Sequence, residues 1–175
     1  MESAGHLEAQ FLELLRDHRG ILLKVASSFA QEPVEQADLF QDMAVELWNS
    51  LPGFEGRSKP STWIYLVCLN TAMAWRRSRD RRRHSHMPLE LVPELGCPLD
   101  LPGRQQEENE LLRKIYDSVR ALPTSERSLV ILLLDGLSYR EIGEITGLTE
   151  NHVGVALTRV RKKLAESLKE VRDEL

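Results

Sequence analysis

Residues 136–163 have the sequence GLSYREIGEITGLTENHVGVALTRVRKK, which predicts two short helices joined by a tight turn. Ser138 and Glu141 have the spacing of a capping box at the start of the first helix. Gly147 suits the turn, and Thr149 is placed to cap the second helix. This layout is that of a helix-turn-helix. The second helix has a buried stripe at steps of four and three residues, made of Val153, Leu157, Val160, Leu164 and Leu168.

The other side of this second helix is a candidate DNA-binding surface. It offers groups that can hydrogen-bond base edges, groups that can touch a thymine methyl, and cations for phosphates. Asn151 or Arg159 could hydrogen-bond base edges, and Val155 or Thr158 could touch a thymine methyl. Arg161 and Lys162 are the cations placed for phosphates. Gly154 and Val155 both lower helix propensity, which favours a small surface pressed against a groove. The alternative is a helical hairpin whose basic face is only solvated.

The residues before this motif also have a helical period, so the predicted fold is all-α. The first two apolar stripes are separated by Pro33, which is expected to end the first helix. Leu-Pro-Gly at 51–53 ends the second. A third helix is expected from Thr62 towards Arg83, with Ser61 placed to cap it.

A change of composition divides the chain into two small helical domains. Residues 87–109 contain four Pro and two Gly without a sustained period, which is typical of a flexible linker. The predicted domains are therefore 1–86 and 110–175. In the second, a helix ends at Pro123, Thr124 or Ser125 caps the next one, and Gly136 terminates it.

The charge is segregated along the chain. The net charge of −4 would by itself argue against a nucleic-acid partner, but residues 76–83 hold six Arg and one Asp. Such a tract favours a polyanion, although a solvated helix end is the alternative. Aromatic residues next to it (Phe54, Trp63, Tyr65 and Trp75) could stack on unpaired bases, or could simply belong to the core. Asn70 is predicted to face outwards, where it could hydrogen-bond a base.

A stripe of acidic residues is predicted on the helix that precedes Leu-Pro-Gly at 51–53. Asp38, Asp42 and Glu46 recur at four-residue steps, so they share one face of a helix. A basic protein surface could bind there, but the residues alone favour an ordinary solvated face.

Several classes of protein are excluded or disfavoured. The chain has no glycine-rich phosphate loop, GxSxG or HExxH motif, so no enzymatic activity and no cofactor are expected. Two Cys exclude a disulfide scaffold, and a metal site at His84, His86 and Cys97 would lack a fourth ligand. The N-terminus has no basic region of a signal peptide, and the longest apolar run, 129–134, is too short to span a bilayer. A cytoplasmic protein without direct membrane insertion or a small-molecule substrate is expected.

The ordered motifs resemble a known family. In the first domain they are ADLFQDMAVELW, FEGRSKPSTWIYLVCLNTA and the Arg tract, and in the second LPTSERSLVILLLDGLSYREIGEITGLTENHVGVALTRVRKKL. Over about 10–85 and 110–170 the chain resembles a bacterial RNA polymerase sigma factor of the extracytoplasmic-function group. The resemblance implies a region-two helical bundle and a region-four helix-turn-helix. It also implies a non-catalytic factor that directs core polymerase to promoters and helps to melt the minus-ten element.

The resemblance also implies a role for individual residues. Those that match the polymerase-binding segment are Asp38, Leu39, Gln41, Asp42, Glu46 and Trp48. Those expected on the minus-ten element are Lys59, Ser61, Thr62, Trp63, Asn70, Arg76 and Arg77. Those expected at the minus-35 element are Arg140, Thr149, Asn151, His152, Gly154, Val155, Thr158, Arg159, Arg161 and Lys162. Pro60 and Leu69 depart from the residues that are common in the family.

Partners follow from the same resemblance. They are the RNA polymerase core and promoter DNA, and members of the group are often held inactive by an anti-sigma factor, although no motif identifies one here. Two alternatives remain open: a stand-alone helix-turn-helix regulator that binds an operator as a dimer, and an adaptor whose helices bind only proteins.

Overall fold

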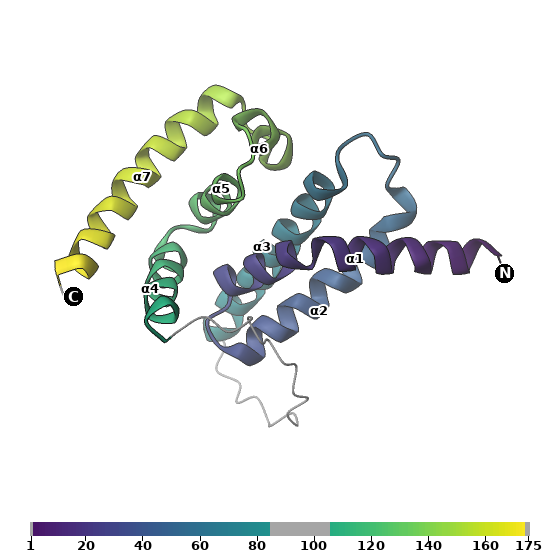
Figure 1. Ribbon diagram of the computed structural model, residues 1–175, viewed down its shortest axis with the longest axis horizontal. Coiled ribbons are helices and arrows are strands. Elements are labelled where there is room, and N and C mark those ends of the chain that lie inside the picture. Colours follow the sequence, from purple (N-terminus) through teal and green to yellow (C-terminus); the bar gives the residue numbers. More distant parts are fainter. Residues whose placement is uncertain (1, 85–105, 174–175) are drawn as a thin grey trace.

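The computed structural model describes residues 2–84 and 106–173, which form helices and no strand. This confirms the predicted all-α class. Figure 1 shows a first half of the molecule built from the helices before the gap and a second half built from those after it. We use these two terms for residues 2–84 and 106–173. Residues 85–105, which include 87–105 of the predicted linker, lie outside the described part, and residues 106–109 of that linker belong to a helix.

The first half consists of α1 (Glu2–Phe29), α2 (Pro33–Ser50), the short 3-10 helix η1 (Leu51–Gly53) and α3 (Pro60–His84). The predicted boundaries need two corrections. Pro33 begins α2 rather than ending α1, and α3 starts at Pro60 rather than near Thr62. Both follow from the fixed φ of proline and its missing N–H, which suit the first position of a helix.

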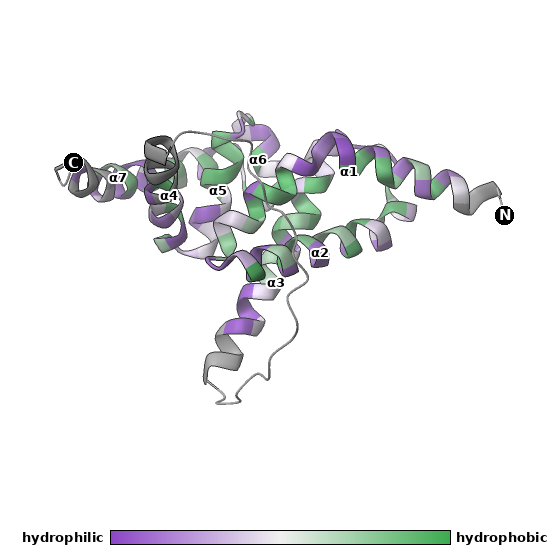
Figure 2. Ribbon diagram, turned by 60° about the horizontal axis from the view of Figure 1, so that its bottom comes forward, coloured by the Kyte–Doolittle hydropathy of each residue, from purple (hydrophilic) through white to green (hydrophobic). Residues whose placement is uncertain are grey.

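The core of the first half lies where these three helices meet. The most buried side chains are Leu22, Val25 and Phe29 of α1, Leu39 and Met43 of α2, and Ile64, Tyr65 and Cys68 of α3. Figure 2 shows hydrophobic residues on the sides of the helices that face one another. Burial raises the pKa of the Cys68 thiol to about 12, so this thiol stays protonated and unreactive.

The second half consists of α4 (Gln106–Ala121), α5 (Thr124–Leu134), α6 (Tyr139–Thr146) and α7 (Glu150–Asp173). The capping box is confirmed: the Ser138 Oγ accepts from the Glu141 N–H, and a Glu141 carboxylate oxygen accepts from the Ser138 N–H at 2.9 Å. Gly136 and Gly147 have φ values of 78° and 75°, the left-handed conformation expected of them. The cap predicted for α5 is wrong, because Pro123 occupies that position.

Arg127 stabilises the end of α4 from inside the second half. Its side chain is 3% exposed, and its Nη2 donates to the backbone carbonyls of Arg120 and Leu122. The last carbonyls of a helix have no partner within the helix, so a buried guanidinium satisfies them.

The two halves pack against each other rather than standing apart. One continuous core contains Leu22 and Ile64 of the first half together with Leu132 and Ile142 of the second. Figure 1 shows α6 beside the N-terminal part of α3, and α7 along the edge farthest from the start of α1. In the described residues, no helix is both long enough and apolar enough to cross a bilayer.

Candidate nucleic-acid and protein interfaces

The outer face of α7 carries most of the residues predicted to contact DNA. Opposite the buried Val153, Leu157 and Val160, the exposed residues on this helix are Asn151, His152, Val155, Thr158, Arg159, Arg161 and Lys162. Arg140 of α6 and Thr149 are exposed beside them. The helix-turn-helix therefore presents amide, hydroxyl, apolar and cationic groups on one accessible face, the mixture that major-groove recognition uses.

Local hydrogen bonds position some of these side chains. The Thr149 Oγ1 accepts from the His152 N–H at 3.3 Å, which confirms Thr149 as the cap of α7. The same oxygen lies 3.0 Å from the His152 Nδ1. The Arg140 Nε donates to Glu144 at 3.1 Å, so Arg140 is held along the surface of α6.

Packing explains why glycine occupies two positions in the helix-turn-helix, and neither explanation was predicted from the sequence. A Cβ on Gly143 would lie 2.6 Å from the backbone oxygen of Leu148, so only glycine fits there without a backbone shift. Gly154 is half-buried, and a Cβ on it would lie 3.4 Å from the Tyr139 ring. The small size of Gly154 thus suits the contact between α6 and α7, whereas the predicted reason was close contact with a DNA groove.

Gly143→Ala is expected to destabilise the chain by roughly 1–3 kcal/mol, because the added methyl overlaps backbone that cannot rotate away. Thermal unfolding followed by circular dichroism measures the change. The matched control is Gly20→Ala on the exposed side of α1, where a Cβ meets open space. That variant should be stabilised by a few tenths to about 1 kcal/mol. Equal melting temperatures for the two variants would contradict the packing described for the turn.

The acidic stripe lies on the surface of α2. Asp38, Gln41, Asp42 and Glu46 are exposed. The pKa of Asp42 is raised above its ordinary value, first by partial burial and then by repulsion from Asp38 and Glu46. The repulsion from Asp38 and Glu46, which is the smaller cause, places Asp42 in a negative field that attracts cations.

Apolar residues extend this acidic surface. Val34 and Val45 are 67% and 56% exposed, and Trp48 is 38% exposed with its ring edge-on to Phe11, centroids 5.2 Å apart. These two valines were not among the predicted surface residues. Their positions outside the apolar stripe of the helix could have identified them. An acidic surface with exposed apolar groups is suited to a protein partner. Leu39 is fully buried, so it supports α2 from the core and offers no surface to a partner.

The residues predicted to contact the minus-ten element differ in their solvent exposure. Asn70 and Arg77 are exposed, Ser61 and Arg76 are half-buried, and Thr62 is 7% exposed. A direct contact from Thr62 is therefore excluded in this arrangement. Trp63 is half-buried and stacks on Phe54 with ring centroids 4.6 Å apart, so part of its surface serves packing and not base stacking.

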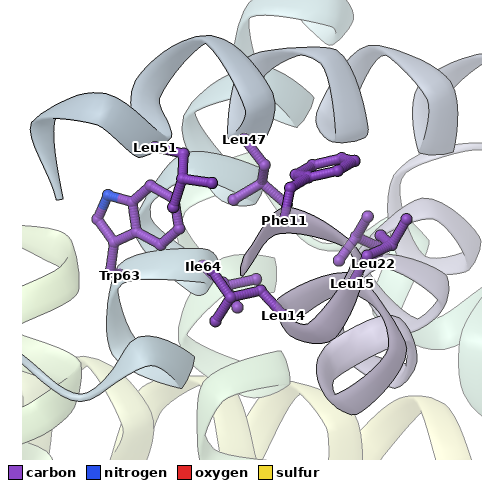
Figure 3. Close-up of a pocket in the computed structure, with 8 residues that line it drawn as sticks. All are labelled: Phe11, Leu14, Leu15, Leu22, Leu47, Leu51, Trp63 and Ile64. Carbon is purple, nitrogen blue, oxygen red and sulfur yellow. The ribbon is translucent and has the colours of Figure 1, made fainter. Parts of the chain in front are cut away.

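Trp63 also closes a small apolar cavity within the first half (Figure 3). The cavity is lined by apolar side chains of α1, α2, η1 and α3, and its free volume is about 10 Å³. That space is at or below the size needed for one water, and no polar group lines it. The cavity is therefore a packing gap and not a ligand site.

The Arg tract is partly neutralised by its own half of the molecule. Arg79 pairs with Glu35 in the first turn of α2, and its guanidinium lies 5.3 Å from the Trp75 ring centroid. Trp75 is half-buried. Of the three candidate metal ligands, His86 and Cys97 lie outside the described residues. The residues that the structure describes contain no cluster of three or more side chains that could ligate a metal ion.

Comparisons with known proteins match both halves. The family model for sigma-70 region 2 matches residues 14–82, and that for sigma-70 region 4 matches residues 112–164. The ECF RNA polymerase sigma-E factor of Haemophilus influenzae is 28% identical over 138 residues, which is 75% of this chain and 73% of that protein. The RNA polymerase sigma factor YlaC of Bacillus subtilis is 28% identical over 141 residues, 78% and 79% of the two chains.

Solved structures share the fold. The sigma factor RpoE from Bartonella quintana, in complex with the anti-sigma factor NepR, has a TM-score of 0.65 at 23% identity, over 93% of this chain and 96% of that one. The structure of CnrH in complex with the cytosolic domain of CnrY has a TM-score of 0.67 at 22% identity. Both conserved regions, in this order and within this fold, show that the chain belongs to the sigma-70 family of RNA polymerase sigma factors, in its extracytoplasmic-function group.

Proposed function

We propose that this sigma factor divides promoter recognition among three separate surfaces and contributes no catalytic step of its own. The acidic surface of α2 binds core polymerase. The loop before α3 and the outer face of α3 bind the minus-ten element, and the outer face of α7 binds the minus-35 element. We also propose the domain boundaries 1–86, 87–109 and 110–175, and action in the cytoplasm, where polymerase works.

The observation that carries this proposal is that two accessible surfaces, one on α2 and one on α7, carry opposite charge. The stripe on α2 is acidic, whereas the exposed face of α7 contains Arg159, Arg161 and Lys162. Proteins that bind DNA neutralise phosphates with cations, and an acidic face repels DNA. Two surfaces of opposite sign in one chain therefore support two different partners. A stand-alone operator-binding regulator leaves the acidic surface of α2 without a role.

The polymerase-binding surface is proposed from residues that the fold leaves accessible. They are Asp38, Gln41, Asp42, Glu46 and Trp48, together with Val34 and Val45. The minus-ten surface is proposed from Lys59, Ser61, Trp63, Asn70, Arg76 and Arg77. The minus-35 surface is proposed from the exposed residues of α6 and α7 named above, with Gly154 supporting them from beneath.

Melting follows from differential binding. A base that leaves the stack finds a hydrogen-bonding group at Asn70 and cations at Arg76 and Arg77, which the paired duplex cannot use in the same way. Binding energy then favours the single-stranded state. The overall charge of −4 keeps the free chain a poor DNA binder, and tethering to polymerase raises its effective concentration at the promoter.

An anti-sigma factor is proposed as a further partner. The support is the likeness of this fold to two solved sigma factors, one of them bound to the anti-sigma factor NepR and the other to CnrY. In both cases the likeness extends over 93% of this chain, so both halves contribute to it.

Asn70→Ala is expected to reduce open-complex formation about five- to tenfold while leaving core affinity unchanged, because Asn70 is exposed on α3 whereas the acidic stripe lies on α2. Permanganate reactivity of the minus-ten thymines measures opening. Open-complex formation by the variant should return to the parent level on a promoter whose minus-ten region is already mismatched, because no free energy is then needed to unpair the bases. An equal loss in opening and in core binding would contradict this division of labour.

A further inference from the structure

The outer face of α3 carries an exposed side chain that the proposed function does not use. Leu66 is 37% exposed, whereas its apolar neighbours Ile64, Tyr65 and Leu69 are buried. Among the residues of α3 whose burial the structure describes, Leu66 is the one large hydrophobic side chain that is exposed. A single exposed leucine is ordinary on a protein surface, so the residues around it decide whether it belongs to a binding surface.

The residues around Leu66 carry no charge. Residues 60–75 contain no Asp, Glu, Lys or Arg, although the accessible face of a surface helix usually carries charged side chains. Over 61–75 the exposed residues are Leu66, Asn70 and Ala74. They are spaced four residues apart, so they lie in one row along the outer face of α3. We call this row the uncharged strip.

Cations lie at both ends of the uncharged strip. Lys59 is exposed directly before α3, and Arg76 and Arg77 follow within one turn of Ala74. Phosphates are bound by cations, whereas bases are recognised by amides and apolar groups. The strip therefore suits a nucleic-acid strand whose phosphates contact the ends of the row and whose bases contact the row itself.

The spacing of the strip relates Leu66 to Asn70, which the proposed function places against a base. Four residues of helix correspond to about 6 Å along the axis, and successive bases of a strand are about 3.4 Å apart. Leu66 therefore reaches a base within two steps of the one at Asn70. Its side chain offers only apolar surface, and the apolar group that a base can offer in return is the 5-methyl of thymine.

We propose that Leu66 is a specificity-determining residue that contacts the 5-methyl group of a thymine in the minus-ten element. The inference rests on the proposed function and deepens it, because it names a chemical group that the minus-ten surface recognises. Ala74, on the other side of Asn70, keeps the row low, so the strand can lie close to α3. The contact uses apolar surface that the core of the first half leaves accessible.

The test changes only the methyl group of one base at a time. In synthetic promoter duplexes, each thymine of the minus-ten region is replaced by uracil, which removes the methyl, and each cytosine by 5-methylcytosine, which adds one. Both changes keep the base pair and its hydrogen bonds. Abortive RNA synthesis by core polymerase with the full chain measures open-complex formation. The quantity compared is the ratio between the methylated and the unmethylated form of each duplex.

The parent chain should favour the methylated form about fourfold at one position, the amount expected for burying one methyl-sized group. That position should lie within two base steps of the one at which Asn70→Ala changes base preference most. Leu66→Ala should bring the ratio there to about one, because the apolar partner of the methyl is gone. Leu66→Met should keep the ratio, since methionine has a similar volume and is also apolar.

The matched control is Leu12→Ala on α1, which makes the same change at a leucine that is 56% exposed and outside the proposed surfaces. It should keep the parent ratio. Each ratio compares two duplexes with the same protein, so a partial loss of folded protein cancels. Core affinity of Leu66→Ala should equal that of the parent, because the acidic stripe lies on α2.

Two results would overturn the role of Leu66: a parent ratio near one at every pyrimidine, or a Leu66→Ala ratio equal to that of the parent. If the parent chain still starts RNA synthesis at defined promoters and Asn70→Ala is defective, the proposed function stands and only the role of Leu66 fails. A parent chain that starts RNA synthesis at no defined site with core polymerase would refute both.

Discussion

Asp42→Arg is expected to weaken binding to core polymerase about 100-fold. Asp42 lies between Asp38 and Glu46 on the exposed face of α2, and its pKa is raised first by partial burial and then by the negative charges of these neighbours. An arginine there places a like charge against the basic partner surface that the stripe is proposed to meet, and like-charge juxtaposition costs several kcal/mol. Titration of fluorescent core polymerase with the variant measures the loss.

The matched control reverses an acid outside the proposed surfaces. Glu8→Arg on α1 makes the same change of charge at an exposed position, so it tests whether net charge alone matters. It should bind core polymerase within about twofold of the parent. If Asp42→Arg also stays within twofold, the acidic surface of α2 is not the polymerase interface.

The carboxylates of the acidic stripe should lower the free energy of unfolding at neutral pH. A raised pKa means that the folded chain holds the Asp42 proton more tightly than the unfolded chain does. This contribution therefore favours folding as pH falls through the raised pKa, and is unfavourable above it. Asp42→Asn is expected to raise the melting temperature at neutral pH while it weakens polymerase binding. A lowered melting temperature would mean that the stripe is held by partners within the chain.

Arg159→Ala is the second variant with a large expected effect. Arg159 is exposed on α7, opposite the buried stripe, where a guanidinium can contact a base edge and a phosphate. Its loss should cost about 1–3 kcal/mol, or roughly 5- to 150-fold in transcription from promoters that depend on the minus-35 element. Core affinity should not change. Quantified transcripts from minus-35 promoter variants give the measurement.

Lys169→Ala provides the comparison on the same helix. Lys169 is exposed near the end of α7, more than two turns beyond Arg159, and it should act as a distant charge only. Its effect should be small and should not depend on the minus-35 sequence. An Arg159→Ala variant that is equally defective on every minus-35 sequence would show that Arg159 contacts the backbone and does not read bases.

Local sequence rules predicted the helix-turn-helix well. Ser138 and Glu141 form a capping box through side chains three residues apart, and Gly136 and Gly147 have the φ that their positions demand. Each depends on neighbours in sequence, so a pattern is enough to find it. The predicted cap of α5 was wrong because Pro123, which has no side-chain hydrogen-bonding group, occupies the N-cap position. The turn from α4 is held instead by Arg127, which donates to the carbonyls of Arg120 and Leu122.

The site was predicted less completely, for a related reason. Spacing placed Asp38, Asp42 and Glu46 on one exposed face. It could not show that Leu39 and Thr62 are buried, because burial depends on which helices meet. Nor could it show that Lys59 pairs with Glu141, 82 positions later in the chain. Contacts between the halves are tertiary, so no local period records them.

Site-specific crosslinking in the open complex tests the account most directly. A photoreactive amino acid is placed in turn at Asp42, Asn70 and Arg159, and the complex is assembled with core polymerase on promoter DNA. Three different crosslinked products are expected: polymerase from position 42, the non-template strand of the minus-ten element from position 70, and minus-35 duplex from position 159. Crosslinks of positions 42 and 159 to the same partner, or none to DNA from position 70, would contradict it.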